Sequence, residues 1–346
     1  MSPTHLKSPV FADVDISSDE TVFAALARAE DRVSRLDERA RASGFLEGWR
    51  ARADVRAVIA AMAIDGRLVH PEDLILRDVN ADARLPDPGV TRASALLRSR
   101  QRAHQGGDEL LGWQGISWIC GLTKQAPPPG PRPTARVLAR VGESGAVAVL
   151  EAFFDGLAKH DTEAPRVGVE DCLGVLDLDV RLPPLLQAAA FLEAWRIADP
   201  LPGHRAAGAI AAALILKSSR RFTAALFPVD VGSRRRALPP RLAWAPLSER
   251  LAYWLGVIEL AAELELEEIT RLGHQKALLD RKAAGGRRHS KAPAFAALAV
   301  EHPVLTTALI VRGLGVTPQG GLQLVKRFGG ALHEITGRSR YRVWRL

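Results

Sequence analysis

The chain has 346 residues, of which 47% are hydrophobic and 25% are charged. This length allows two or three domains, and the composition is that of an ordinary globular protein, which excludes extensive disorder. Two cysteines are too few for a disulfide-rich secreted fold. The formal net charge is +8, and its meaning depends on where the charges lie along the sequence.

The basic excess is confined to the C-terminal end. Residues 281–346 contain twelve Lys or Arg and two acidic residues, whereas residues 1–280 carry a net charge of −2. Such a localised excess predicts a polyanionic partner. The longest strongly apolar run, 206–216, has 11 residues, whereas a bilayer span needs roughly 20. Because no secretory signal is recognisable either, we expect a cytoplasmic protein without membrane contact.

The composition along the chain predicts a series of consecutive regions. Residues 1–20 are expected to be a flexible N-terminus, followed by an N-terminal helical region over 21–104. Residues 105–133 are rich in Gly and Pro and predict a long exposed connection. A second helical region, 134–281, completes a body that is expected to be mainly α.

Hydrophobic periodicity defines the expected elements of this body. Apolar residues recur at intervals of three and four, with charges on the opposite face, which is typical of amphipathic helices. The stretch 222–243 lacks such a pattern and is predicted to be irregular. Helices are predicted over 21–43, 47–64, from Pro71 onward, 91–104, 134–160, 183–198, 206–218 and 246–281.

The strongest local signal follows a predicted linker, 282–292, and occupies 293–346. A short helix is expected to end near Glu301, and Thr306 or Thr307 can cap a second helix. After a glycine-bearing turn at 313–316, Thr317 can cap a third helix that has Pro318 in its first position. In that helix Leu322, Val325 and Phe328 are expected to face the core.

The segment HEITGRSRYRVWRL at the C-terminus predicts a basic β-hairpin. Helix, turn, helix and hairpin form the order of a winged helix-turn-helix, whose last helix enters the major groove of DNA. Gln pairs well with adenine, and Lys and Arg pair with phosphates. The predicted DNA-binding residues are Thr317, Gln319, Gln323, Lys326, Arg327, Arg338, Arg340 and Arg342.

Two observations favour the alternative, a winged helix used for dimerisation with a merely solvated basic face. Runs of charge are commonly just solvated surface. In addition, Gly320 and Gly321 lie inside the presumed recognition helix, and each weakens a helix by roughly 1 kcal/mol relative to Ala.

A family resemblance is carried by the segment GLGVTPQGGLQLVKRFGGALHEITGRSRYRVWRL. It resembles the C-terminal end of helix-turn-helix proteins from rhizobial and related alphaproteobacterial replicons. The stretches LARAEDRVSRLDERARAS, LVHPEDLILRD and TRASALLRSRQR resemble the same family, so the resemblance covers most of the chain. It implies a DNA-binding protein and says little about mechanism.

The arrangement is also similar to Fic/DOC proteins with a C-terminal winged helix, whose catalytic loop reads HPFxxGNGR. The nearest stretch here is DPLPGHR, in which Asp199 stands in place of the catalytic His. The loop is also shorter, and its Gly-Asn-Gly-Arg phosphate nest is missing. The degenerate loop comprises Asp199, Pro200, Gly203, His204 and Arg205.

Fic transfer needs the His as a general base and backbone amides to hold the phosphates. The resemblance therefore implies a Fic-like helical bundle that is a pseudoenzyme, with no catalytic residues, cofactor or metal. Our leading hypothesis is a bacterial transcriptional regulator that binds double-stranded DNA, as a homodimer by analogy with other helix-turn-helix proteins. Two alternatives stay open: residual nucleotidyl transfer based on Asp199 and His204, and a protein-interaction or antitoxin-like module.

Overall fold

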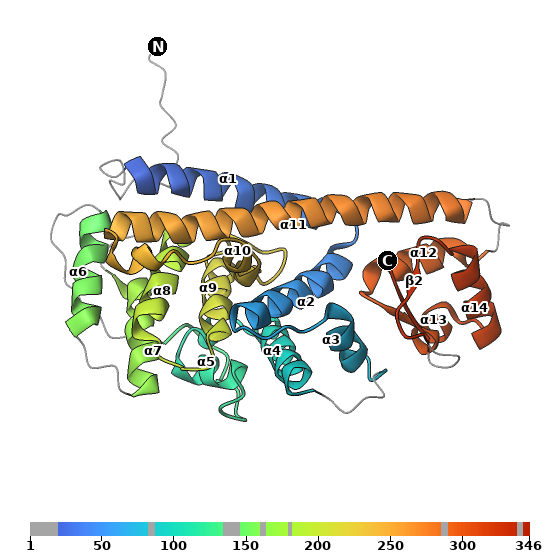
Figure 1. The fold of residues 1–346 in the computed structure, drawn as a ribbon, viewed down its shortest axis with the longest axis horizontal. Coiled ribbons are helices and arrows are strands. Elements are labelled where there is room, and N and C mark those ends of the chain that lie inside the picture. Colours follow the sequence, from blue (N-terminus) through green and yellow to red (C-terminus); the bar gives the residue numbers. More distant parts are fainter. Residues whose placement is uncertain are drawn as a thin grey trace, which may run out of the picture. The chain divides into compact units, whose positions relative to one another are not determined.

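The structure, a computed structural model, is mainly helical, with one small sheet near the C-terminus (Figure 1). It describes residues 20–81, 87–133, 146–159, 164–178, 182–284, 290–337 and 342–346. The expected fold class, mainly α with a C-terminal helix-turn-helix and a small hairpin, is confirmed. The predicted flexible N-terminus, 1–20, lies outside the described residues except for Glu20.

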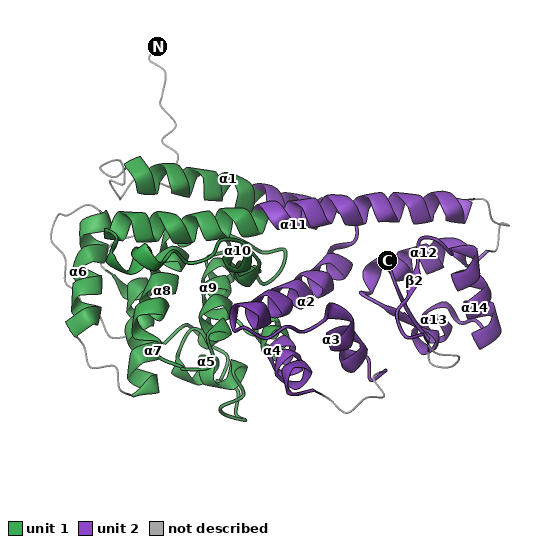
Figure 2. Cartoon of the chain, in the orientation of Figure 1, with its two compact units in different colours: residues 1–34, 99–262 green, residues 35–98, 263–346 purple. Residues whose placement is uncertain are grey.

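The chain forms two compact units, each built from two separate stretches (Figure 2). Unit 1 comprises Met1–Ser34 and Ser99–Ala262, and unit 2 comprises Arg35–Arg98 and Glu263–Leu346. This division differs from the consecutive regions predicted from the sequence, because the C-terminal helix-turn-helix shares its unit with residues from the N-terminal third. Three helices contribute to both units: α1 (Glu20–Ala42), α4 (Pro88–Gln105) and α11 (Leu247–Ala284).

Unit 1 is centred on two apolar helices, α8 and α9. Both are apolar on nearly every side, which is why both are buried along most of their length. Gly208 of α9 allows their close approach, because a Cβ there would lie 2.6 Å from the ring of Trp195. The helices that lie wholly within unit 1 are η1 (Asp108–Leu110), α5 (Trp113–Ile119), α6 (Ala146–Lys159), α7 (Pro165–Leu173), η2 (Gly174–Asp177), α8 (Pro184–Ala198), α9 (Ala206–Ser218), α10 (Val229–Arg235) and η3 (Pro240–Trp244).

One carboxylate is completely buried in this apolar core. Glu193 of α8 is 0% exposed, and its oxygens accept hydrogen bonds from Arg196, at 2.6 and 2.8 Å, and from Arg250, at 2.8 Å. The indole N–H of Trp254 donates a further bond of 2.9 Å. Two guanidinium groups and the indole compensate for the loss of water, so the charge is tolerated.

In the part of the chain that the structure describes, no helix is long and apolar enough to cross a membrane.

Two predictions for unit 1 are wrong in part. The stretch 105–133 is exposed only over its second half; its first half forms η1 and α5 and buries Leu110, Ile116 and Ile119. Glycines dominate its composition, yet the apolar residues between them can reach the core. The stretch 222–243 likewise contains α10 and the start of η3, which are too short to show helical periodicity.

Unit 2 combines two N-terminal helices with the C-terminal segment. Its hydrophobic core includes Val58 and Met62 of α2, Leu74 of α3, and also Val304 and Val343 from the C-terminal segment. The helix-turn-helix therefore shares a core with α2 and α3. The elements are α2 (Leu46–Ile64), α3 (Pro71–Asp78), α12 (Ala292–Glu301), β1 (Leu305–Thr306), α13 (Thr307–Leu314), α14 (Pro318–Arg327), β2 (His333–Glu334) and β3 (Val343–Arg345).

Candidate nucleic-acid interface

The two helices of the helix-turn-helix begin at threonine caps. The Thr306 hydroxyl accepts a hydrogen bond of 3.1 Å from the backbone N–H of Leu309 and begins α13. That helix ends at Gly315, whose φ of 62° is left-handed. The Thr317 hydroxyl then accepts a 3.1 Å bond from Gly320 N–H and begins α14. The predicted caps and the turn between them are confirmed, and they fix where α14 starts.

One of the two glycines in α14, Gly321, has a packing role. Gly321 is buried, and a Cβ there would lie 3.0 Å from Cγ2 of Ile310 on α13. A larger residue at this position would push the two helices apart, so the conformational cost of glycine is offset by close packing. Further along, the rings of Phe328 and Phe295 lie 5.0 Å apart and join the end of α14 to α12. The close packing of α13 and α14 therefore accounts for one of the two helix-weakening glycines, Gly321.

The outer face of α14 is polar and basic. Gln319, Gln323 and Lys326 are all exposed, as DNA contacts require. The prediction that Leu322 faces the core is wrong, because 43% of this residue is exposed. The buried side of α14 is formed by Gly321 and Val325, and Leu322 lies about 100° from Gly321 around the helix axis. The sequence predicts an apolar side chain at this core position of α14, and the structure has Gly321 there instead.

Two predicted DNA-binding residues also have structural roles. Thr317 is exposed, with its hydroxyl oxygen occupied as the cap of α14. The Arg327 guanidinium donates to the carbonyl oxygens of Lys282, at 3.1 Å, and Ala283, at 3.4 Å, in the last turn of α11. In return, Lys282 Nζ donates to the Gly329 carbonyl at 2.7 Å. The end of α14 is thus tied to the end of α11, a contact over 45 residues of sequence that no local pattern reveals.

The hairpin completes a three-stranded antiparallel sheet of order β1-β3-β2. Leu305 of β1 pairs with Trp344 of β3, and His333 of β2 pairs with Arg345. Arg342 is exposed, and its Nε lies 3.8 Å from a carboxylate oxygen of Glu334. The predicted DNA-binding residues Arg338 and Arg340 lie outside the described residues.

The helix-turn-helix is seated on α2 by a close backbone approach. Gly48 of α2 faces the C-terminal end of α12, where a Cβ would lie only 2.1 Å from the Val300 carbonyl oxygen. One turn later, the Arg52 guanidinium donates to the carbonyls of Val300, at 2.7 Å, Ala299, at 3.2 Å, and His302, at 2.7 Å. These carbonyls have no partner within α12, so Arg52 caps that helix from outside. Burial lowers the pKa of Arg52 to about 10, which leaves it charged at neutral pH.

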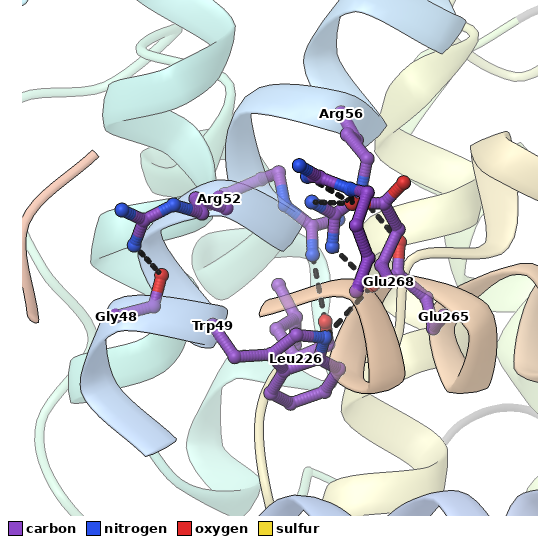
Figure 3. A network of polar contacts seen from close by, with 9 residues as sticks. Gly48, Trp49, Arg52, Arg56, Leu226, Glu265 and Glu268 are labelled. Carbon is purple, nitrogen blue, oxygen red and sulfur yellow. Dashed lines mark hydrogen bonds and ion pairs between the residues drawn. The ribbon is translucent and has the colours of Figure 1, made fainter. Parts of the chain in front are cut away.

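A buried ion pair holds α2 against the second half of α11 (Figure 3). Glu265 of α11 is 0% exposed and accepts a 2.9 Å bond from the Trp49 indole and a 2.9 Å bond from Arg56 Nε. Arg56 also lies 3.4 Å from a carboxylate oxygen of Glu268. Although burial lowers the pKa of Arg56, the two carboxylates outweigh this effect and raise it. Because Glu265 is completely buried, loss of Arg56 would leave its carboxylate without a charged partner.

The stretch that resembles the Fic catalytic loop in sequence is a tight turn between α8 and α9. Asp199 ends α8 with a left-handed φ of 38°, and Gly203 has a φ of 77°. Asp is among the few non-glycine residues that adopt this conformation readily, which gives Asp199 a conformational role. Pro200 is buried, whereas Asp199, His204 and Arg205 are exposed. Among the described residues, no cluster of three His, Cys, Asp or Glu side chains could hold a metal ion.

Two family models match parts of the chain. A family model described as an HTH DNA binding domain matches residues 292–346, so the match begins one residue before the predicted start of this region at 293. A model described as a protein of unknown function, DUF1612, matches residues 171–284, which include α11 and the loop between α8 and α9. The protein y4cF of Sinorhizobium fredii, named as uncharacterized, is 30% identical over 356 residues, covering 90% of this chain and 93% of that protein.

The chain belongs to the y4cF family. The resemblance to rhizobial helix-turn-helix proteins is thereby confirmed. A solved Fic family protein from Desulfovibrio desulfuricans is similar to this member of the y4cF family over 98% of both chains, with 14% identity and a TM-score of 0.46. A score and identity this low transfer no activity, so the catalytic state of the body has to be considered from its own residues.

Proposed function

We propose that this protein is a transcriptional regulator that binds duplex DNA through α14 and whose helical body is not catalytic. The observation that carries the proposal is the outer face of α14, where Gln319, Gln323 and Lys326 are exposed on a helix that is capped and packed from behind. A helix of this kind fits the major groove, in which amide groups pair with base edges.

Charge supports a polyanionic partner. Residues 281–346 carry a net charge of +10, and no acidic residue occurs in α13 or α14. Phosphates attract such a surface at long range, and base contacts then select the sequence. A dimerisation surface would not need this one-sided charge, which is why we prefer DNA over the alternative.

The proposal of an inactive body rests on the loop between α8 and α9. Asp199, in the place of the Fic general base, has a conformational reason to be Asp, because it ends α8 in a left-handed conformation. Its carboxylate would repel the phosphates of a nucleotide, and Gly203 is the only glycine left of the nest. Incubation of the full chain with labelled nucleotide is expected to give no labelled protein. Labelling that His204→Ala abolishes would contradict this part.

The regulatory role is tested by crosslinking the full chain to DNA in the bacterium that carries it and sequencing the bound fragments. Discrete sites near promoters are expected for the wild type, and Gln319→Ala is expected to lose or redistribute them. Because Gln319 is exposed, its replacement leaves the fold intact. Binding spread evenly over the genome, or none at all, would contradict a regulator.

We also expect a homodimer, by analogy with helix-turn-helix proteins that bind two half-sites. Light scattering by the purified full chain gives its mass directly. A monomer that stays monomeric on an excess of duplex would contradict this expectation and would leave the assignment of α14 unaffected.

A further inference from the structure

The exposed leucine of α14 lies at one edge of its outer face. In an α-helix each residue advances by about 100°, so Gln319, Leu322, Gln323 and Lys326 fall within an arc of about 100°, with Leu322 at one end. Leu322 is 43% exposed, whereas Val325, about 60° further round toward the buried side, is 9% exposed. The apolar side chain therefore borders the polar groups that the proposed function assigns to DNA.

The core positions of α14 next to Leu322 are already filled. They are occupied by Gly321, Val325 and Phe328, of which Gly321 approaches α13 and Phe328 contacts α12. Exposing an apolar side chain offers no stability, since burial of a leucine contributes about 1.5–3 kcal/mol. A single exposed leucine is common on protein surfaces, but this one stands on the face with which the helix would enter the groove.

We propose that Leu322 contacts the 5-methyl group of thymine in the major groove. The proposal rests on the proposed function, because it requires α14 to lie in that groove. Thymine is the one base that presents a methyl group there, and an apolar side chain selects it by excluding water from both groups. Cytosine offers a polar amino group at the neighbouring position, which an apolar side chain leaves unsatisfied.

The neighbours of Leu322 specify the rest of the recognised step. Gln319 lies about one turn before it and Gln323 directly after it, and both amides can pair with adenine N6 and N7. The ligand is therefore duplex DNA in which a thymine facing Leu322 lies within a step or two of an adenine read by a glutamine. Lys326, one turn further along, is placed to meet a phosphate.

The other candidate residues are less free to read bases. The Thr317 hydroxyl holds the cap of α14, and Arg327 is bound to carbonyls at the end of α11. Among the described residues of α14, base selection therefore falls to the two glutamines and Leu322.

The test starts from duplexes that the full chain selects from a random library. In each selected duplex, every thymine is replaced in turn by deoxyuridine, which pairs identically and lacks only the methyl group. We expect one position per half-site at which this replacement weakens binding about three- to five-fold, as expected for burial of one methyl group. Leu322→Ala is expected to abolish this difference while still binding the duplex.

Leu68→Ala provides the matched control. Leu68 is 91% exposed in the segment between α2 and α3, so Leu68→Ala removes the same side-chain atoms from the surface, away from the outer face of α14. It should keep both the affinity and the deoxyuridine effect of the wild type. An absence of any selected duplex would overturn the proposed function itself. Selected binding without a deoxyuridine-sensitive position, or with a sensitivity that Leu322→Ala retains, would overturn the contact between Leu322 and thymine alone.

Discussion

The close approach of Gly48 to α12 makes Gly48→Ala an informative perturbation. The added Cβ would lie 2.1 Å from the Val300 carbonyl oxygen and 2.9 Å from its carbon, both of which are backbone atoms. Neither can rotate away as a side-chain tip could, so α2 and α12 must separate by about 1 Å to restore ordinary contact. That displacement also breaks the 2.7 Å bond from Arg52 to the same carbonyl.

The expected loss follows from these contacts. Overpacking costs about 1–3 kcal/mol, and a hydrogen bond from a charged group contributes about 1.5–3 kcal/mol. Ala is a better helix former than Gly by about 1 kcal/mol, which offsets part of this loss. We expect Gly48→Ala to lower the free energy of unfolding by about 2–4 kcal/mol, or the Tm by roughly 5–10 °C.

Gly273→Ala is the matched control for this prediction. Gly273 also lies inside a helix of unit 2, and a Cβ there would meet only the Phe45 ring, at an ordinary 3.8 Å. Helix propensity then acts alone, and we expect a gain of up to about 1 kcal/mol. Thermal unfolding followed by circular dichroism compares the two variants. If Gly48→Ala is as stable as Gly273→Ala, α12 is not seated on the backbone of α2, and the reasoning fails.

Three further predictions concern the cap, the thiols and the response to acid. Thr317→Ala should cost about 1 kcal/mol in stability and weaken DNA binding, whereas Thr317→Ser should retain both. Burial raises the pKa of Cys120 to about 12 and that of Cys172 as well, so a thiolate-specific reagent at pH 8 should react much faster after unfolding; equal rates would contradict this. Burial raises the pKa of Glu268, but the bond from Arg271 and neighbouring arginine charges outweigh it, so the pKa is lowered. This stabilisation is present above the unfolded pKa of about 4.3 and is lost as the pH falls through the lower folded pKa. A Tm that falls between about pH 5 and pH 3 as steeply in Glu268→Gln as in the wild type would contradict it.

The features that the sequence predicted well are those with a local cause. The caps at Thr306 and Thr317 depend on residues three positions away, and the structure shows both. The long helix α11 and the apolar α9 are likewise determined by their own periodicity and composition. For the candidate site, the exposure of Gln319 follows from the same local pattern.

The features that were missed depend on distant partners. Nothing in the sequence around Gly48 or Arg52 indicates that these residues contact α12, which follows some 250 residues later. Arg327 has the charged side chain of a typical phosphate ligand, and yet it donates hydrogen bonds to carbonyls at the end of α11. The apolar side chain of Leu322 predicts a core position, yet Leu322 is 43% exposed. Only the packing of Gly321 against Ile310 shows that the core position is already filled.

The central claim, that α14 binds duplex DNA, is tested most directly by the salt dependence of the affinity of the full chain. Fluorescence anisotropy with a labelled mixed-sequence duplex gives the association constant over a range of salt concentrations. Its logarithm should fall linearly with the logarithm of salt, with a slope of about −0.9 per phosphate contacted. Lys326→Ala should reduce that slope by about one contact, whereas Lys124→Ala, which removes another exposed lysine, from the loop after α5, should not. No salt-sensitive binding, or an equal effect of the two variants, would contradict the assignment.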